Sequence, residues 1–452
     1  MPSVRSAAVA GMFYPGEARA LSVELDELLG DAAMAAPRLG FPKALVVPHA
    51  GYVYSGPVAA RAYDELGAAR GLVRRVVLLG PVHRVPVRGL AVPTDQAFAT
   101  PLGTIRVDRA ALDAVRSLRQ VVASDAAHAL EHSLEVQLPF LQKQLGEFAL
   151  APFAVGDATV DEVAEVIERL WGGRETLIVI STDLSHYHRY ADARRIDGLT
   201  LARIGSLSSD LAHDEACGAT PLNGFLALAR RKKLKARLLA ACNSGDTAGS
   251  RDRVVGYSAF ALHEPGGEVS PDEAGRTLLG LARAAIESRL HGSAAGAEAP
   301  WLAQAGATFV TLVRDGQLRG CIGSLQAVRP LGVDVAENAL GAAFRDPRFP
   351  PMTAAEWPQV KVEVSLLSTP RPLRFADEAD LLAQIQPGED GLILECLGDS
   401  GVKRATFLPQ VWEDIPDKRL FLSQLMRKAG IPEGTRLARC RIWRYRVSKW
   451  KE

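Results

Sequence analysis

The chain has 452 residues, a formal net charge of +1, 48% hydrophobic residues and 23% charged residues. This length exceeds what one hydrophobic core usually supports, so two or more domains are expected. The near-zero net charge excludes a global electrostatic attraction to nucleic acid or to an anionic membrane. No apolar run reaches the roughly 18 residues that a membrane-spanning helix needs. We therefore expect no nucleic-acid partner and no membrane partner.

The five cysteines are widely spaced, odd in number and include no CxxC pair. This usage argues against a disulfide framework and a zinc ribbon, and it favours the reducing cytoplasm. The N-terminal sequence MPSVRSAAVAGMFYPGE has only a short apolar core, which is typical of mature protein rather than of a signal peptide. We therefore expect a cytoplasmic protein.

The first half of the chain alternates predicted strands and helices. Runs rich in Val, Ile and Leu predict strands at Ala44–Val47, Arg75–Leu79, Leu177–Ile180, Ala236–Ala240 and Val254–Leu262. Helical periodicity predicts helices at Ala18–Leu29, Val58–Leu66, Ser133–Leu145 and Asp161–Trp171. Continuous apolar strands separated by helices indicate an α/β domain with a largely buried sheet.

The clearest seam is HEPGGEVSPDEAGR at residues 263–276, which contains two prolines and two consecutive glycines. A capped helix is predicted to follow it, and a Gly/Ala-rich loop is predicted at residues 291–300. We place an α/β domain at residues 1–265, a linker at 266–275 and a second domain at 276–452.

The second domain is predicted to be α+β with a mainly antiparallel sheet. ATFVTLVRDGQLRGCIGS reads as a hairpin that turns at Asp315 and Gly316, and GLILECLGDSGVKRATFLP reads as another. VKVEVSLLS alternates like an amphipathic strand.

Polar residues directly follow four predicted strands of the first half. The residues are His49, His83, the group Asp183, His186 and His188, and the pair Cys242 and Asp246. In α/β sheets ligands bind beyond the carboxyl ends of the strands, so four such ends predict one shared cleft. Imidazole and thiolate together suit zinc, copper or iron. A single histidine there would more often be a turn residue, but the coincidence of four ends favours a site.

The segment HALEHSLEVQLPF carries a further polar cluster. His128 and His132 match the inverted zincin pattern H-x-x-E-H, but no third ligand follows downstream. We favour an N-terminal helix turn in which Glu131 or His132 lines the same cleft. An exposed polar helix start is the alternative that the sequence leaves open.

Six motifs occur in order over about residues 4–263, and together they closely resemble the Memo family. They are AAVAGMFYPG, VVPHAGYVYSG, LLGPVH, EHSLEVQLPFLQ, STDLSHY and CNSGDT. That family is similar in fold to LigB-type extradiol dioxygenases, whose non-haem iron is held by two histidines and a carboxylate. The resemblance implies a LigB-like fold with a strand-end cleft.

The same resemblance implies that His49, His83 and Cys242 bind a metal. Asp183 and His186 would then act as acid/base or substrate-orienting groups, and His132, which the segment above places in the same cleft, is a further candidate catalytic residue. Iron(II) is the expected cofactor, with copper or zinc as alternatives, because a thiolate in place of a carboxylate offers these softer metals a better site.

The second half resembles the AMMECR-type domain over about residues 270–452. LRGCIGSL, AAFRDPRFPPM, VEVSLLSTP and FLPQVWED carry this resemblance. The two families occur with a radical-SAM protein in the AmmeMemoRadiSam system, of which this chain would fuse proteins B and A. A radical-SAM partner is therefore implied, and the chain itself has no radical-SAM cysteine triplet.

A substrate groove in the second domain is predicted around Cys321. Cys321 is a candidate nucleophile and Arg319 precedes it on the same strand, while Arg345, Asp346 and Arg348 could bind a carboxylate or phosphate. A structural glycine turn with a salt-bridged loop is the alternative.

Three hypotheses for the function follow from these residues. The first is a metal-dependent redox enzyme that acts on a small molecule or peptide. The second is a catalytically inactive binding or scaffold protein on a dioxygenase-like fold. The third is a metal-free hydrolase with Cys242 as its nucleophile.

Overall fold

The computed structural model describes residues 3–32, 39–267, 269–292, 299–398, 401–432, 435 and 437–452. These residues divide into two compact units, each with its own hydrophobic core. The first unit contains the described residues up to Gly267 apart from Leu39, and the second contains Leu39 and the described residues from Val269 to Glu452.

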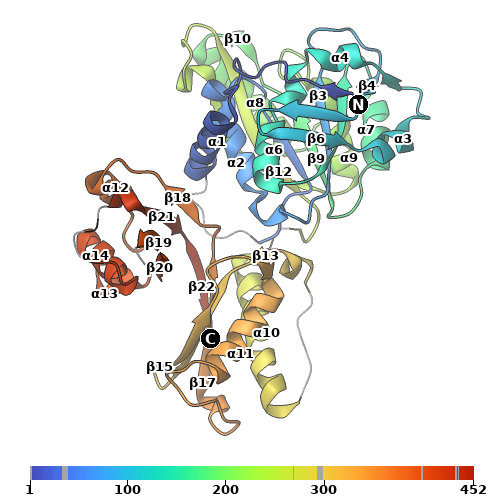
Figure 1. Ribbon diagram of the computed structural model, residues 1–452. Coiled ribbons are helices and arrows are strands. Elements are labelled where there is room, and N and C mark those ends of the chain that lie inside the picture. The colour runs from blue at the N-terminus through green and yellow to red at the C-terminus, as the bar shows by residue number, and fades with distance from the viewer. Residues whose placement is uncertain are drawn as a thin grey trace. The chain divides into compact units, whose positions relative to one another are not determined.

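The first unit is built on a mixed sheet of twelve strands (Figure 1). At its centre four parallel strands lie side by side in the order β8 (Ala149–Val155), β3 (Arg75–Pro81), β9 (Thr176–Ser181) and β2 (Ala44–Val47). Nearly every residue of these strands is buried, as expected for parallel strands covered on both faces. The predicted α/β fold of this half is confirmed.

Shorter or antiparallel strands extend the sheet on both sides. They are β1 (Val4–Arg5), β4 (Leu90–Val92), β5 (Ala97–Thr100), β6 (Gly103–Val107), β7 (Val121–Ala123), β10 (His186–His188), β11 (Lys235–Asn243) and β12 (Val254–His263).

Helices cover the sheet, with α1, α2 and α6 packed together and α7 packed against α9 (Figure 1). The helices are α1 (Ala18–Ala32), α2 (Tyr52–Asp64), α3 (Arg109–Val115), α4 (Asp125–Ala129), α5 (His132–Glu135), α6 (Leu138–Leu145), α7 (Val160–Arg169), α8 (Tyr190–Gly205) and α9 (Ala219–Arg231). This unit also has 3₁₀ turns at Gly67–Ala69 and Ser244–Asp246. A further 3₁₀ turn, Trp357–Gln359, belongs to the second unit.

One predicted helix is divided in the structure. The segment 133–145 forms α5 and α6, which meet at Val136 and Gln137. Pro139 lacks an N–H and favours the first turn of a helix, so it begins α6 rather than continuing α5.

The second unit contains two four-stranded antiparallel sheets, which confirms its predicted class. One sheet has the order β15 (Gln317–Gly323), β14 (Thr308–Arg314), β17 (Val360–Leu367) and β22 (Val447–Lys451), and the other the order β18 (Arg371–Leu373), β21 (Cys440–Tyr445), β19 (Gly391–Gly398) and β20 (Gly401–Phe407). A short pair joins β13 (Ala305–Gly306) to β16 (Arg329–Pro330). The hairpin β14–β15 turns at Asp315 and Gly316, both with positive φ, as a type I′ turn requires.

Helices α10 (Pro271–His291) and α11 (Leu331–Phe344) pack together beside the first of these sheets (Figure 1). The remaining helices are α12 (Glu378–Gln384), α13 (Val411–Asp414) and α14 (Lys418–Lys428), with 3₁₀ turns at Pro300–Ala303 and Leu437–Arg439. The predicted loop at 291–300 lies mostly outside the described residues.

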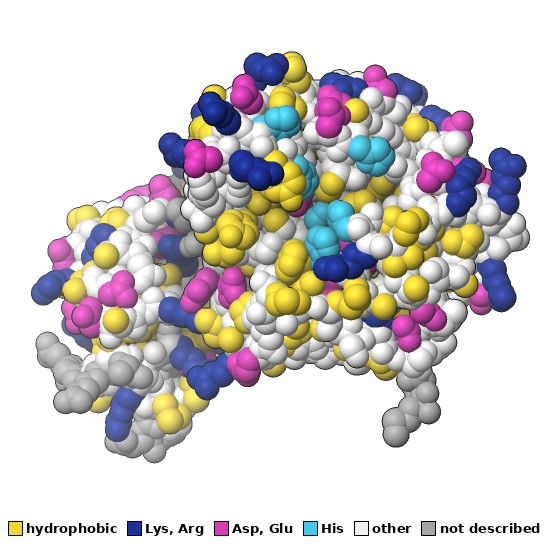
Figure 2. Space-filling view, turned by 90° about the horizontal axis from the view of Figure 1, so that it is seen from above, with side chains coloured by type: hydrophobic (Ala, Val, Ile, Leu, Met, Phe, Trp, Pro, Cys, Tyr) yellow, Lys and Arg dark blue, Asp and Glu magenta, His cyan; other side chains and the backbone are white. Residues whose placement is uncertain are grey.

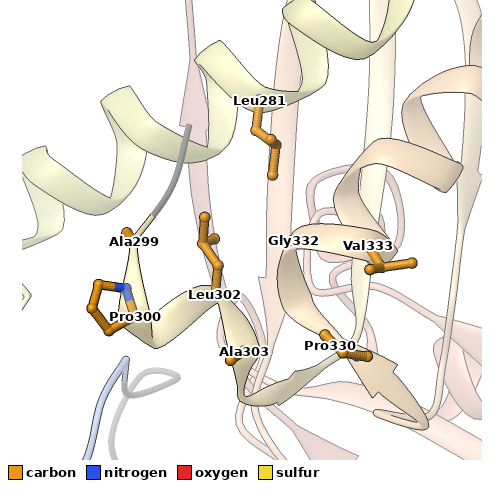
Figure 3. Close-up of a pocket in the computed structure, with 8 residues that line it drawn as sticks. All are labelled: Leu281, Ala299, Pro300, Leu302, Ala303, Pro330, Gly332 and Val333. Atoms are coloured by element: carbon orange, nitrogen blue, oxygen red, sulfur yellow. The ribbon is translucent and has the colours of Figure 1, made fainter. Parts of the chain in front are cut away.

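An apolar pocket of about 630 Å³ lies between α10, the start of α11 and the 3₁₀ turn at Pro300 (Figure 3). Leu281 of α10 points towards Leu302 across it. Among the described residues, no helix combines the length and hydropathy that crossing a bilayer requires.

The second unit contains a disulfide bond that the number and spacing of the cysteines did not predict. Cys396 and Cys440 form a disulfide, although they are 44 positions apart in the sequence. They lie directly opposite one another in the register of β19 and β21, so strand pairing brings their sulfurs together. This bond corrects the expectation that the cysteines do not support disulfide pairing.

Candidate metal centre

Three histidines of the first unit converge at the carboxyl edge of the parallel strands. His49 follows β2, His83 follows β3, and His132 is the first residue of α5. One ligand nitrogen from each lies within 4.8 Å of those of the other two. The ring centroids are 4.6 to 5.4 Å apart. Figure 2 shows histidine side chains gathered around a hollow on this face of the molecule.

The tautomer of His49 is determined by a buried chain of hydrogen bonds. The Ser181 hydroxyl donates to the Ser133 carbonyl at 2.7 Å and accepts from Gln137 Nε2 at 2.9 Å. Tyr63 donates to Gln137 Oε1, which fixes the orientation of that amide. Because the only hydroxyl proton of Ser181 is already used, His49 Nδ1 must carry the proton in its 2.9 Å contact with Ser181. Nε2 of His49 therefore carries no proton and has the lone pair that a metal needs.

Glu131 orients the other two imidazoles. Its carboxylate accepts from His83 Nδ1 at 2.9 Å and from the His83 backbone N–H at 2.7 Å, and it lies 3.4 Å from His132 Nδ1. Burial alone would raise the pKa of Glu131, but the bonds from His83 and from the Ser133 amide lower it to about 2. A carboxylate behind a ligating histidine fixes the ring and increases its basicity.

The imidazoles of His49 and His132 are held in their neutral form. Burial lowers the pKa of His49 well below its usual value, and the neighbouring histidines lower it further. Burial also lowers the pKa of His132 to about 4. Neutral imidazole is the form that ligates metals, so at neutral pH His49 and His132 need lose no proton to do so.

Asp183 and Cys217 lie beside His49. Asp183 Oδ1 accepts from the His49 backbone N–H at 2.7 Å, and its Oδ2 is 3.9 Å from His49 Nε2. Cys217 Sγ is 3.4 Å from His49 Nε2 and accepts from the Asp183 N–H. Burial raises the pKa of Asp183 to about 7 and that of Cys217 to about 12. Without a metal, Cys217 is therefore a thiol, and Asp183 can change its proton near neutral pH.

These groups share one pocket of about 530 Å³. Its lining consists of His49, His83, His132, Asp183, His186, Tyr187, His188, His213, Asp214 and Cys217. His186 directs Nδ1 to the Leu184 carbonyl at 2.9 Å, which leaves Nε2 for other contacts. The pocket thus combines a three-imidazole group with a thiol, a titrating carboxyl and further imidazoles.

The sequence matches the family described as Memo-like protein over residues 5–261. The chain belongs to the Memo-like family. It also matches the family AMMECR1 over residues 279–450, so two families are fused in one chain, as predicted.

Several curated MEMO1 family proteins resemble this Memo-like chain. The protein of Ignicoccus hospitalis is 36% identical over 287 residues, which cover 58% of this chain and 99% of that protein. The protein of Pyrobaculum arsenaticum is 33% identical over 282 residues, again 58% and 99% of the two chains. A crystal structure of the uncharacterized protein PH0010 from Pyrococcus horikoshii is 31% identical, with a TM-score of 0.35, over 40% of this chain and 92% of that one.

Of the predicted Memo-like ligands, Cys242 is the one outside the three-residue group. It belongs neither to that group nor to the lining of the pocket, as far as the described residues extend. Cys242 lies on β11, which pairs with β12, and β12 separates β11 from β2 and His49. The candidate imidazole group thus contains His132 and lacks Cys242, whose role as a ligand stays a prediction, and Cys217 is the thiol that lines the pocket.

The predicted roles of Asp183, His186 and His132 stay predictions, and the structure shows where these residues lie. Asp183 and His186 line the pocket beside the three imidazoles, as the strand-end comparison implied. His132 is part of the imidazole group itself. His128, the first residue of the H-x-x-E-H match, is buried elsewhere and bonds to the Ala91 carbonyl. This separation excludes an inverzincin arrangement of His128 and His132.

The arginines of the predicted groove in the second unit all form ion pairs with carboxylates. Arg319 forks onto Glu356, and Arg345 pairs with Glu337 at 3.0 Å. Arg348 pairs with Asp346 at 2.7 Å, and Asp346 also accepts from the Cys321 N–H. These contacts are those of a salt-bridged loop, and a substrate groove at Cys321 stays a prediction.

Cys217 does not follow an apolar strand, so the pattern of polar residues at strand ends does not mark it. It lies near the end of the α8–α9 loop, and the following residue, Gly218, approaches the Ser181 carbonyl so closely that an added Cβ would lie 2.8 Å from that oxygen. The Cys-Gly pair just before a helix, in EACGATPLNGF, is the signal that could have indicated a site.

Proposed function

We propose that the first unit is a metal-dependent redox enzyme, with iron(II) as the expected metal and copper or zinc as the alternatives. The observation that carries this proposal is the group of His49, His83 and His132, whose ligand nitrogens lie within 4.8 Å of one another. Imidazole is a good donor to all three metals, and three facing imidazoles leave coordination positions open. The donor set therefore fits such an ion.

The surrounding hydrogen bonds support the same proposal. His49 and His83 each bind protein through Nδ1, which leaves Nε2 as the donor nitrogen. The sulfur of Cys217, 3.4 Å from His49 Nε2, is available as a further soft donor. A bound iron or copper ion would supply one-electron chemistry and a position for substrate.

Proton transfer in this proposal belongs to Asp183 and His186. Because its pKa is about 7, the Asp183 carboxyl can take or give a proton at Oδ2 near neutral pH. His186 offers a second proton carrier through Nε2, for which no hydrogen bond is found within the described residues. Burial of the carboxyl keeps bulk water from competing for that proton.

The test is metal analysis after anaerobic purification, followed by redox titration of the bound ion. Wild-type protein is expected to retain about one ion per chain, and His49→Ala, His83→Ala and His132→Ala are expected to lose it. Cys217→Ala should weaken retention, whereas Cys242→Ala is the matched control and should retain wild-type metal. Retention by all three histidine variants would overturn the metal centre. A bound ion that no oxidant or reductant changes would overturn the redox role and leave a binding protein.

We further propose that the chain acts with a radical-SAM protein. The fusion of a Memo-like region and an AMMECR1 region in one chain supports this proposal. Co-purification of the two proteins from cells that express both would test it, and their separate elution at micromolar concentration would contradict it.

A further inference from the structure

Tyr187 has a backbone conformation that a large side chain rarely adopts. Its φ is +63°, in the left-handed region. It is the extra residue of a bulge in β10, since His186 pairs with Val255 while His188 pairs with the adjacent Val254. Such strain persists only where the surrounding structure imposes it, and it concentrates at functional sites. Bulges beside active sites also redirect a side chain.

The bulge holds the Tyr187 ring in the lining of the metal pocket. The side chain is 64% exposed, although its neighbours His186 and His188 are half-buried. The His186 ring meets it edge-on, with centroids 5.7 Å apart. The Arg253 guanidinium carbon lies 4.8 Å from the centre of the Tyr187 ring. An exposed aromatic ring that is strained into a pocket is placed for stacking.

The charges near this ring favour an anionic ligand. Arg253 is exposed and forms no ion pair within the part of the chain that the structure describes. Asp214 is the exposed carboxylate of the lining, and Asp183 is buried. The exposed guanidinium group of Arg253, which lies against the Tyr187 ring, can therefore pair with an anionic ligand.

We propose that Tyr187 and Arg253 form a substrate subsite that takes a planar, unsaturated molecule bearing a carboxylate or similar anion. Tyr187 stacks on the planar part, and Arg253, fixed against that ring, pairs with the anion. This inference rests on the proposed metal centre, because the same pocket brings the substrate to the three imidazoles.

A matched pair on the same segment provides the control. Arg251 lies 4.6 Å from the ring of Tyr190, just as Arg253 lies over Tyr187. Tyr190 is outside the pocket lining and bonds to Asp246. Substitutions at Tyr190 and Arg251 therefore remove a similar cation–π contact without touching the proposed subsite.

The probe is picolinate, a planar aromatic carboxylate, titrated into cobalt(II)-loaded protein and followed by its visible spectrum. Tyr187→Gly removes the ring and relieves the positive φ, so the urea midpoint should not fall while the picolinate Kd rises about 3- to 10-fold. Arg253→Gln should also raise this Kd. For 2-(aminomethyl)pyridine, which lacks the carboxylate, Tyr187→Gly should still raise the Kd and Arg253→Gln should not. Tyr190→Ala and Arg251→Gln should change neither ligand's Kd.

The outcomes separate this inference from the proposed function. A Tyr187→Gly variant that takes up cobalt normally and keeps the wild-type picolinate Kd overturns the subsite. If wild-type protein takes up no cobalt, the metal centre fails, and the comparison is made with picolinate and metal-free protein. In metal-free protein, weaker binding of picolinate to Tyr187→Gly than to wild type supports the subsite, and an equal picolinate Kd overturns it.

Discussion

Glu131 and His83 are joined by two hydrogen bonds, one from the His83 backbone N–H at 2.7 Å and one from its Nδ1 at 2.9 Å. The same carboxylate lies 3.4 Å from His132 Nδ1. One buried side chain thus orients two of the three imidazoles, although Glu131 is not itself a member of the candidate ligand group.

Glu131→Gln should therefore weaken metal binding without removing any ligand. A neutral amide cannot accept from both imidazoles and both backbone amides, so the rings lose their fixed orientation. We expect a loss of about 10- to 100-fold in metal affinity, measured by competition with a chelator of known affinity. Glu168→Gln on the exposed face of α7 is the control. Equal affinities in Glu131→Gln and wild type would contradict the positioning role.

A buried ion pair joins the N-terminal segment to α5, the helix that begins at His132. Arg5 pairs with Glu135, and their side chains are 3% and 0% exposed. Glu135 also accepts from Tyr14 Oη and from the backbone N–H groups of Ala8 and Val9. Arg5 donates in addition to the carbonyls of His128 and Glu131.

Arg5→Ala should destabilise the first unit by about 3–5 kcal/mol, because it leaves the buried Glu135 charge without its cation. Arg88→Ala is the matched control: the Arg88 guanidinium group is largely exposed to water, so losing its pair with Glu162 should cost much less stability than losing the buried pair. Urea unfolding followed by hydrogen exchange of the β2, β3 and β9 amides reports on this unit alone. Similar losses in the two variants would show that burial of the pair does not matter.

Asp183 predicts a pH dependence of stability in the metal-free protein. Burial raises its pKa from the ordinary value near 4 to about 7, despite the lowering effect of the His49 amide. A carboxyl with a raised pKa binds its proton more tightly in the folded state. Its stabilising contribution is therefore complete below about pH 4 and is lost as the pH rises through about 7.

Asp183→Asn cannot titrate, so it isolates this effect. Between pH 5 and pH 8, wild-type protein should lose about 3 kcal/mol of unfolding free energy relative to the variant. The buried histidines have lowered pKa values and destabilise the fold at acid pH, but they are common to both proteins. Parallel stability profiles of the two proteins would contradict the raised pKa of Asp183.

The Cys396–Cys440 disulfide should stabilise the second unit against unfolding. It closes a loop with a sequence separation of 44, for which the loss of chain entropy in the unfolded state corresponds to about 4 kcal/mol. Dithiothreitol should therefore lower the melting temperature of this unit in wild type and in Cys321→Ser, but not in Cys396→Ser. An unchanged melting temperature in reduced wild type would show that the bond contributes nothing.

Much of the first unit could be predicted from local patterns. The run Ala44–Val47 is apolar at every position and forms β2 with those bounds. Arg75–Leu79 and Leu177–Ile180 lie within the adjacent strands β3 and β9. Because all three are parallel, their following residues His49, His83 and Asp183 meet at one edge. Here a sequence pattern was sufficient, since strand direction determines which ends converge.

The family and the fold class of both halves were thus determined by the sequence, because motifs and the spacing of apolar residues are local properties. The composition of the imidazole group was decided only by the tertiary structure. His132 enters it because Glu131 holds the start of α5 against His83, across 48 positions of sequence. Cys217 enters the pocket while Cys242 lies beyond β12, because lateral strand order, which no single segment encodes, determines which thiol reaches His49.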